Sequence, residues 1–205
     1  MPRRRDPART RRKLLAAGYR EFYRHGFQGG SLKRIVESAG ITKGALFHHF
    51  AGKKELGYAV LEEFLYPAVK SWWVEPLAAS DDPVPVMQSI FGRFRKLLDQ
   101  EKAEEGYLFN GCPICNYAAE MAPLDDGFRE RLDRLYTAWR RAISTALKRG
   151  QDAGRVRADI RPADEAAFLV AAFAGTAATG KVTRKAASFH GALRAIDRHL
   201  EGLRA

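Results

Sequence analysis

Hydrophobic side chains recur at helical spacing along almost the whole chain, and no stretch alternates cleanly between apolar and polar over the length of a strand. The clearest stretch steps by three or four residues from Phe128 to Ala146, and a similar stripe runs from Phe189 to Leu203. Residues spaced in this way lie on one face of an amphipathic helix. The pattern therefore predicts an all-α protein.

Three helices are predicted in the first quarter of the chain. A helix over 8–25 is followed by two short helices, for which Ser31 and Thr42 are suitable N-caps. Gly40 can supply the positive φ that a tight corner between the short helices needs. Two short helices around such a corner form a helix-turn-helix, whose second helix can enter the major groove of DNA.

The positive charge is concentrated in the same region. Residues 1–56 hold 14 basic and 4 acidic residues, a net charge of +10, whereas residues 57–205 hold 21 and 20, a net charge of +1. A cationic module with a helix-turn-helix pattern is typical of nucleic-acid binding. The apolar content of 46% allows a real core and excludes a disordered basic protein. We therefore predict a three-helix DNA-binding domain over 1–56 and a helical bundle over 57–205.

Several classes of protein and site are not expected. The longest apolar run, 166–178, is too short to cross a bilayer, and no apolar segment follows the basic N-terminal residues, so we expect a cytoplasmic protein without a membrane partner. Cysteine and histidine spacings suggest no disulfide framework and no metal site. Gly26, Gly29 and Gly30 form no phosphate-binding loop. We expect no cofactor and no enzymatic activity.

The first quarter of the chain closely resembles the N-terminal domain of the TetR family of bacterial transcriptional regulators. The resemblance rests on Gly26-Phe27, Ser31, the run from Ala39 to Phe50, Lys53 and Leu56. It implies a homodimeric repressor that binds a palindromic operator in double-stranded DNA and is released when the C-terminal helices, which also dimerise, bind a small-molecule effector. By resemblance, the DNA contacts are Ser31, Thr42, Lys43, Gly44, Phe47, His48 and Lys53.

One residue departs from the family pattern. The family commonly has tyrosine where Phe47 stands, and that tyrosine hydroxyl bonds a phosphate. Phe47 has no hydroxyl, so its contact with DNA would be apolar. The arginines at positions 3–5 are either a solubilising tail or a further contact with the minor groove or phosphates.

Aromatic residues of the long helices and the segment around the two cysteines are candidates for an effector pocket. Pro113 suits the first turn of a helix, which would place Cys112 and Cys115 about one turn apart. Either these cysteines line the core or pocket, or they are reactive thiols of a redox- or electrophile-sensing repressor, which is the alternative function. The pocket candidates are Phe94, Phe109, Cys112, Cys115, Asn116, Trp139 and Phe173.

Two C-terminal helices are predicted to form the dimer interface. The helix up to Gly180 is rich in small residues, which let two backbones approach closely, and the last helix has an apolar stripe that nothing in its own chain is expected to cover. The alternative is packing of that stripe within the chain. The interface candidates are Phe168, Ala171, Phe189, Leu193, Ile196 and Leu200.

Overall fold

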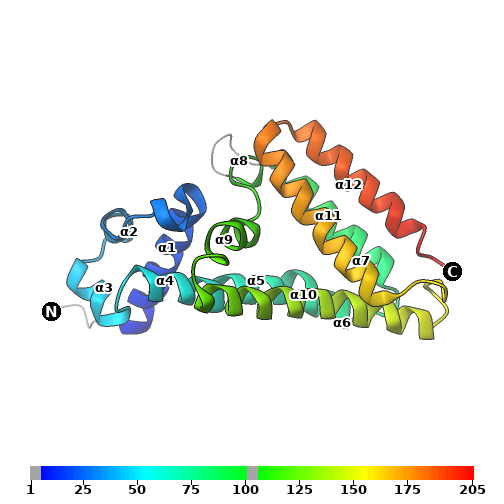
Figure 1. Cartoon of the computed structure of the whole chain (residues 1–205), viewed down its shortest axis with the longest axis horizontal. Helices are drawn as coiled ribbons and strands as arrows, with labels where there is room; N and C mark the ends of the chain where they lie inside the picture. The colour runs from blue at the N-terminus through cyan, green and yellow to red at the C-terminus, as the bar shows by residue number, and fades with distance from the viewer. Residues whose placement is uncertain (1–5, 101–105) are drawn as a thin grey trace. The chain divides into compact units, whose positions relative to one another are not determined.

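The computed structural model describes residues 6–100 and 106–205, and the predicted all-α class is confirmed for them (Figure 1). Within these ranges the only β feature is an isolated bridge between Val156 and Arg204. In chain order the elements are α1 (Pro7–Gly29), α2 (Leu32–Ala39), α3 (Lys43–His49), α4 (Lys53–Val60), the π-helical η1 (Leu61–Leu65), α5 (Tyr66–Val69), the π-helical η2 (Lys70–Val74), α6 (Glu75–Ala78), α7 (Pro83–Gln100), α8 (Tyr107–Asn110), α9 (Pro113–Met121), α10 (Asp126–Asp152), α11 (Pro162–Thr183) and α12 (Ala186–Glu201).

The described residues form two compact units. One, called the headpiece below, contains the residues up to Pro67 together with Asn116–Leu132. The other, called the body, contains Ala68–Cys115 and Asp133–Ala205. The headpiece thus includes a segment that lies far along the chain from the helix-turn-helix.

Local hydrogen bonds define the short helices of the headpiece. The Ser31 hydroxyl accepts from the Arg34 N–H (3.5 Å), and the Thr42 hydroxyl accepts from the Ala45 N–H (3.2 Å), as predicted for N-caps. Gly40 ends α2 in the left-handed conformation with φ of 63°. The apolar sides of both helices are buried, since Val36, Leu46 and Phe50 are all less than a tenth exposed. The predicted helix-turn-helix is therefore confirmed.

α1 is broken at Gly26, directly after the predicted end of the first helix at His25, and a further short turn continues to Gly29. At Gly26 the backbone has φ of 73° and ψ of 167°, which frees the N–H groups that follow. The N–H groups of Phe27 and Gln28 both donate to the Glu120 carboxylate, each at 2.7 Å. Successive backbone N–H groups after such a turn form a natural site for an anion. Glu120 of α9 is therefore held against the end of α1.

A second carboxylate connects the start of α10 to α4. One oxygen of Asp125 accepts from the Tyr58 hydroxyl (2.5 Å) and from the Phe128 N–H (3.0 Å), and the other pairs with the Lys54 ammonium (2.6 Å). The Lys54 and Tyr58 hydrogen bonds lower the pKa of Asp125 to about 2. The centroid of the Phe128 ring lies 4.7 Å from the ring centroids of both Tyr58 and Phe27. Residues 116–132 thus complete the core of the headpiece.

The core of the body is aromatic. The Trp73 ring lies 5.1 Å from the Trp139 ring and 5.5 Å from the Phe91 ring, and Phe173 lies 5.9 Å from Trp139. All four side chains are less than 5% exposed. These side chains come from η2, α7, α10 and α11, so burial of their rings holds the helices of the body together.

α7, α11 and α12 lie side by side in the body (Figure 1). Phe189, Leu193, Ile196 and Leu200 of α12 are at most 5% exposed within the single chain. The expectation that nothing in the chain covers this stripe is wrong, because α12 packs on α7 and α11. These four residues are core residues of the body, and we do not retain them as interface candidates.

Replacing Asp125 by Asn tests the junction between α4 and α10. Because folding lowers the pKa of Asp125 to about 2, the carboxylate contributes stability above its ordinary pKa near 3.8, and this contribution is lost as the pH falls toward 2. We expect Asp125→Asn to be less stable than the wild type at pH 7 and to lose less stability between pH 4 and pH 2. Thermal unfolding across this pH range measures both effects.

Asp126→Asn is the matched control, since the Asp126 side chain is 86% exposed and its ion pair is with Arg129, one turn away. We expect its pH profile to follow the wild type. A profile of Asp125→Asn that runs parallel to the wild type between pH 4 and pH 2 would contradict the role given to Asp125.

Candidate nucleic-acid interface and effector region

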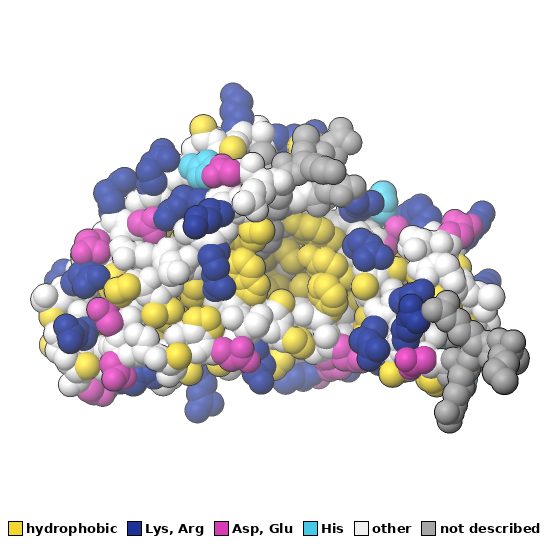
Figure 2. Space-filling view, turned by 180° about the vertical axis from the view of Figure 1, so that it is seen from behind, with side chains coloured by type: hydrophobic (Ala, Val, Ile, Leu, Met, Phe, Trp, Pro, Cys, Tyr) yellow, Lys and Arg dark blue, Asp and Glu magenta, His cyan; other side chains and the backbone are white. Residues whose placement is uncertain are grey.

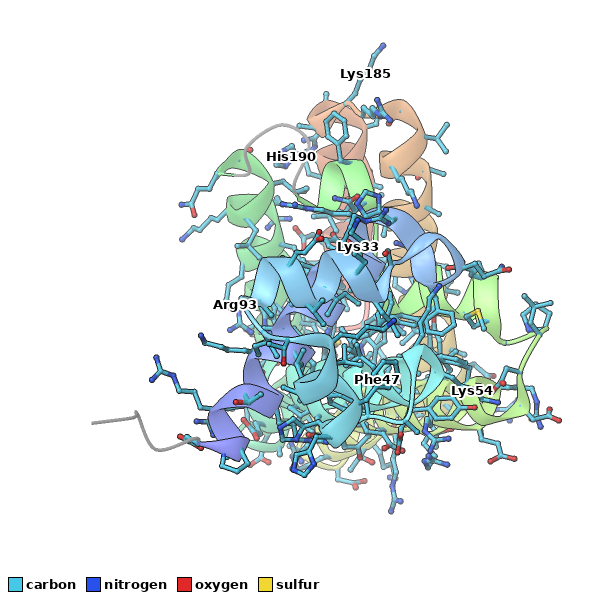
Figure 3. All side chains as sticks on the ribbon, turned by 90° about the vertical axis from the view of Figure 1, so that its left-hand side faces the viewer. Lys33, Phe47, Lys54, Arg93, Lys185 and His190 are labelled. Carbon is cyan, nitrogen blue, oxygen red and sulfur yellow. The ribbon has the colours of Figure 1, made fainter. Side chains whose placement is uncertain are left out.

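α3 presents a polar, cationic face with one aromatic ring. Lys43, Gly44 and His48 are exposed, and Phe47 is 46% exposed, whereas Leu46 is fully buried. Thr42, which caps the helix, is also exposed. Figure 3 views the headpiece from this side, with Phe47 on α3, Lys33 on α2 and Lys54 at the start of α4. Five of the seven predicted DNA contacts therefore share one exposed helix and its cap.

Packing within the protein does not explain why residue 44 is a glycine. A Cβ placed there would meet no atom within 4 Å among the described residues. Glycine inside a helix costs about 1 kcal/mol relative to alanine, and nothing in the headpiece requires that cost. A glycine on an exposed helix face is explained when a partner must approach the backbone closely.

Ser31 and Lys53, the other two predicted contacts, make internal hydrogen bonds. The Ser31 N–H donates to Glu21 (2.8 Å), whose carboxylate also pairs with Arg34 (2.6 Å). The Lys53 ammonium donates to the Gln28 carbonyl (2.8 Å), and its partial burial lowers its pKa. Each residue keeps further hydrogen-bonding capacity, namely the Ser31 hydroxyl proton and two Lys53 N–H groups.

Sequence reasoning missed two kinds of residue in this region. Lys33 is an exposed cation on α2 (Figure 3). Its position in the basic first quarter of the sequence could have identified it as a candidate phosphate contact. Glu120 and Asp125 organise the headpiece from more than 60 residues away, and no local pattern signals that role. The arginines at positions 3–5 lie outside the described residues.

Four of the predicted effector-pocket residues are connected in the body. The Tyr136 hydroxyl lies 3.5 Å from the Cys115 sulfur, and the Tyr136 ring lies 6.3 Å from that of Trp139. Phe173 lies 5.9 Å from Trp139 and 4.7 Å from Phe94. The Trp139 indole N–H is buried and has no hydrogen-bond partner among the described residues. One connected group of side chains in the body therefore contains four of the pocket candidates, namely Cys115, Trp139, Phe173 and Phe94. The indole N–H of Trp139 is its unpaired hydrogen-bond donor among the described residues.

Of the other three pocket candidates, Cys112 is beside Cys115, whereas Phe109 and Asn116 lie elsewhere. Arg184 stacks over the Phe109 ring, with 4.5 Å between its guanidinium carbon and the ring centroid. Asn116 belongs to the headpiece. Figure 2 shows hydrophobic side chains on one face of the protein, with Lys and Arg side chains spread around them.

The two thiols are close together and sheltered. Cys112 is 2% exposed, and its side chain hydrogen bonds with that of Cys115. This hydrogen bond and burial both raise the pKa of the Cys115 thiol. Because a thiolate is the reactive form of cysteine, this environment favours an unreactive neutral thiol. Across the described ranges, no group of three histidine, cysteine or carboxylate residues could hold a metal ion.

Two family models match the chain. "Bacterial regulatory proteins, tetR family" matches residues 14–60, and "Tetracyclin repressor-like, C-terminal domain" matches residues 89–196. Among curated relatives, the HTH-type transcriptional repressor DhaR of Mycobacterium sp. (strain GP1) is 30% identical over 179 residues, covering 86% of each chain. The HTH-type transcriptional repressor NemR of Escherichia coli (strain K12) is 26% identical over 175 residues, covering 85% of each.

Solved structures share the fold over nearly the whole chain. The reduced form of E. coli NemR has a TM-score of 0.79 at 22% identity and covers 96% of this chain and 97% of its own. A TetR transcriptional regulator from Chloroflexus aurantiacus has a TM-score of 0.82 at 22% identity and covers 97% of both. With an N-terminal and a C-terminal model both matched, the chain belongs to the TetR family of bacterial regulatory proteins, which are DNA-binding regulators of transcription.

Proposed function

We propose that this protein is a homodimeric repressor that binds a palindromic operator through α3 of each protomer and is released by a small-molecule effector bound in the body. The exposed face of α3 carries this proposal. It presents the Lys43 ammonium, the His48 imidazole and the open backbone at Gly44, and the Thr42 hydroxyl caps the helix. The relatives DhaR and NemR are named repressors.

The seven predicted contacts divide into two groups by their surroundings. Thr42, Lys43 and His48 can hydrogen bond to base edges or phosphates from the exposed α3 face, where Gly44 allows close approach and Phe47 contributes apolar surface. Ser31 and Lys53 are partly engaged in the headpiece and suit phosphate contacts, which fix the register of the protein on DNA.

An exposed stripe on α11 is the surface that we assign to the dimer. The apolar run 166–178 is too short to cross a bilayer, but the whole of α11, among the described residues, is long and apolar enough by length and composition alone. A helix that packs in a protein core passes the same test. One face is buried in the body, while the other exposes apolar and small residues at steps of three and four. Such a stripe allows close antiparallel or parallel pairing of two helices. It consists of Phe168, Ala171, Gly175, Ala178 and Val182.

The aromatic chain of the body is the proposed effector region. Its walls are apolar, and the unpaired Trp139 N–H offers a single donor, which suits a small and mainly apolar molecule. α9 carries Cys115 at one end and Glu120 near the other, and Glu120 binds the backbone of α1. A change in α9 caused by the effector would therefore reach the headpiece through the Glu120 hydrogen bonds.

The alternative trigger is covalent modification at Cys112 and Cys115. Their direct hydrogen bond places the sulfurs close together, and one similar solved structure is described as a reduced form, that of NemR. The raised pKa of Cys115 favours the non-covalent trigger instead.

The double variant Lys43→Ala, His48→Ala tests the recognition helix. Each lost contact is worth about 1–3 kcal/mol and is lost in both half-sites, so we expect at least a hundredfold weaker operator binding. The operator is first selected from a random duplex library, and binding is followed by fluorescence anisotropy and footprinting at several salt concentrations. Lys185→Ala, an exposed lysine of the body, is the control (Figure 3). A wild-type footprint from the double variant would refute the assignment of α3.

Phe168→Glu tests the dimer surface. Phe168 is 49% exposed in the single chain, so the change should leave the protomer folded while placing a charge in the proposed interface. We expect monomers in analytical ultracentrifugation and weaker binding to the two-half-site operator. Leu97→Glu changes an exposed leucine of α7 (40% exposed) in the same way and should stay dimeric. Dimers of Phe168→Glu at micromolar concentration would exclude this stripe.

The double variant Cys112→Ser, Cys115→Ser separates the two triggers, because it removes every cysteine of the chain. We expect wild-type protein treated with N-ethylmaleimide or hydrogen peroxide to keep its operator affinity within about twofold, because Cys112 is buried and the raised pKa of Cys115 favours its neutral thiol. Release of wild-type protein by these reagents, together with resistance of the serine variant, would instead establish the thiol trigger.

A further inference from the structure

We propose that Phe47 reads the 5-methyl group of one thymine in each operator half-site. The proposal rests on the proposed function and adds to it the chemical group that the exposed aromatic ring recognises.

The ring of Phe47 is exposed although the headpiece core does not need it there. The buried face of the helix-turn-helix is already formed by Leu46 and Phe50, which are at most 1% exposed, while Phe47 is 46% exposed. Exposed apolar surface of this kind gains free energy only when a partner covers it. The Phe47 ring is therefore available to contact a bound partner.

The surroundings of the ring define what that partner offers. The Lys43 ammonium lies 5.9 Å from the ring centroid, one helical turn earlier, and His48 follows directly. Gly44, three residues before Phe47 and so on the same face, leaves open space beside it. The Phe47 ring is thus an isolated apolar group on a cationic surface. The open space at Gly44 beside it allows the edge of a base to approach.

Base pairs offer one apolar group to such a point in the major groove. Their edges there consist of hydrogen-bond donors and acceptors, with the C5-methyl group of thymine as the exception. A phenyl ring placed against a donor, an acceptor or a phosphate would leave that group unpaired, because phenylalanine can neither donate nor accept. The thymine methyl is therefore the group that the Phe47 ring matches.

The test replaces thymines of the selected operator by deoxyuridine, one position at a time, which removes only the methyl group. At one thymine per half-site we expect the full-length wild-type protein to bind about fourfold more weakly, and about fifteenfold more weakly when both half-sites are changed. Replacement at the other thymines should change affinity by less than twofold. Fluorescence anisotropy at constant salt measures these ratios.

Two variants assign the effect to the ring. Phe47→Ala should bind the thymine and deoxyuridine operators equally, and circular dichroism should show an unchanged fold, because the side chain is exposed. The matched control His48→Ala, on the same helix, should bind more weakly but keep the fourfold preference for thymine.

A wild-type protein that is insensitive to deoxyuridine at every position overturns this inference and leaves the proposed function intact. So does a Phe47→Ala protein that keeps the thymine preference. If the random library yields no enriched sequence at all, the proposed function fails, and this inference fails with it.

Discussion

Two backbone N–H groups at the break in α1 shape the headpiece, because a single carboxylate from α9 accepts from both of them. The left-handed turn at Gly26 directs the N–H groups of Phe27 and Gln28 to one point, and the Glu120 carboxylate accepts both. The Phe27 bond is partly buried, and leaving a buried N–H unpaired costs about 1–3 kcal/mol. Glycine is required for the turn, since a Cβ at this φ would be strained and would lie 3.0 Å from the carboxylate. The DNA-binding helices thereby depend on a residue of α9.

Asp125 has the same effect on α4. Its ion pair with Lys54 and its hydrogen bond with Tyr58 place the start of α10 beside the helix that follows the helix-turn-helix. With the aromatic contacts of Phe128, these interactions make residues 116–132 part of the headpiece. α9 therefore contributes Glu120 to the headpiece, while its first turn carries Cys115 of the proposed effector region.

α11 and α12 have similar spacings of apolar residues, but the α12 stripe is buried in the core and the second α11 stripe is exposed. Both helices carry apolar residues at steps of three and four, and the last helix has the stronger stripe in the sequence. Within the chain, however, α12 covers α7 and α11, so its stripe is buried. α11 is apolar on two faces, and its second face, from Phe168 to Val182, stays exposed. An exposed apolar face on a helix whose other face is already buried is the better candidate for a dimer interface.

The sequence by itself was enough for the all-α class, the helix-turn-helix and its family. Those features depend on interactions within a few residues: Ser31 and Thr42 cap the helices that directly follow them, and Gly40 turns the chain between them. Tertiary structure alone decided that Glu120 and Asp125 complete the headpiece and that the α12 stripe is core. The contacts of Glu120 with α1 span 92 and 93 residues, and such partners follow from how helices pack rather than from any local pattern. Periodicity shows that a helix face must be covered, but only the packed chain shows which surface covers it.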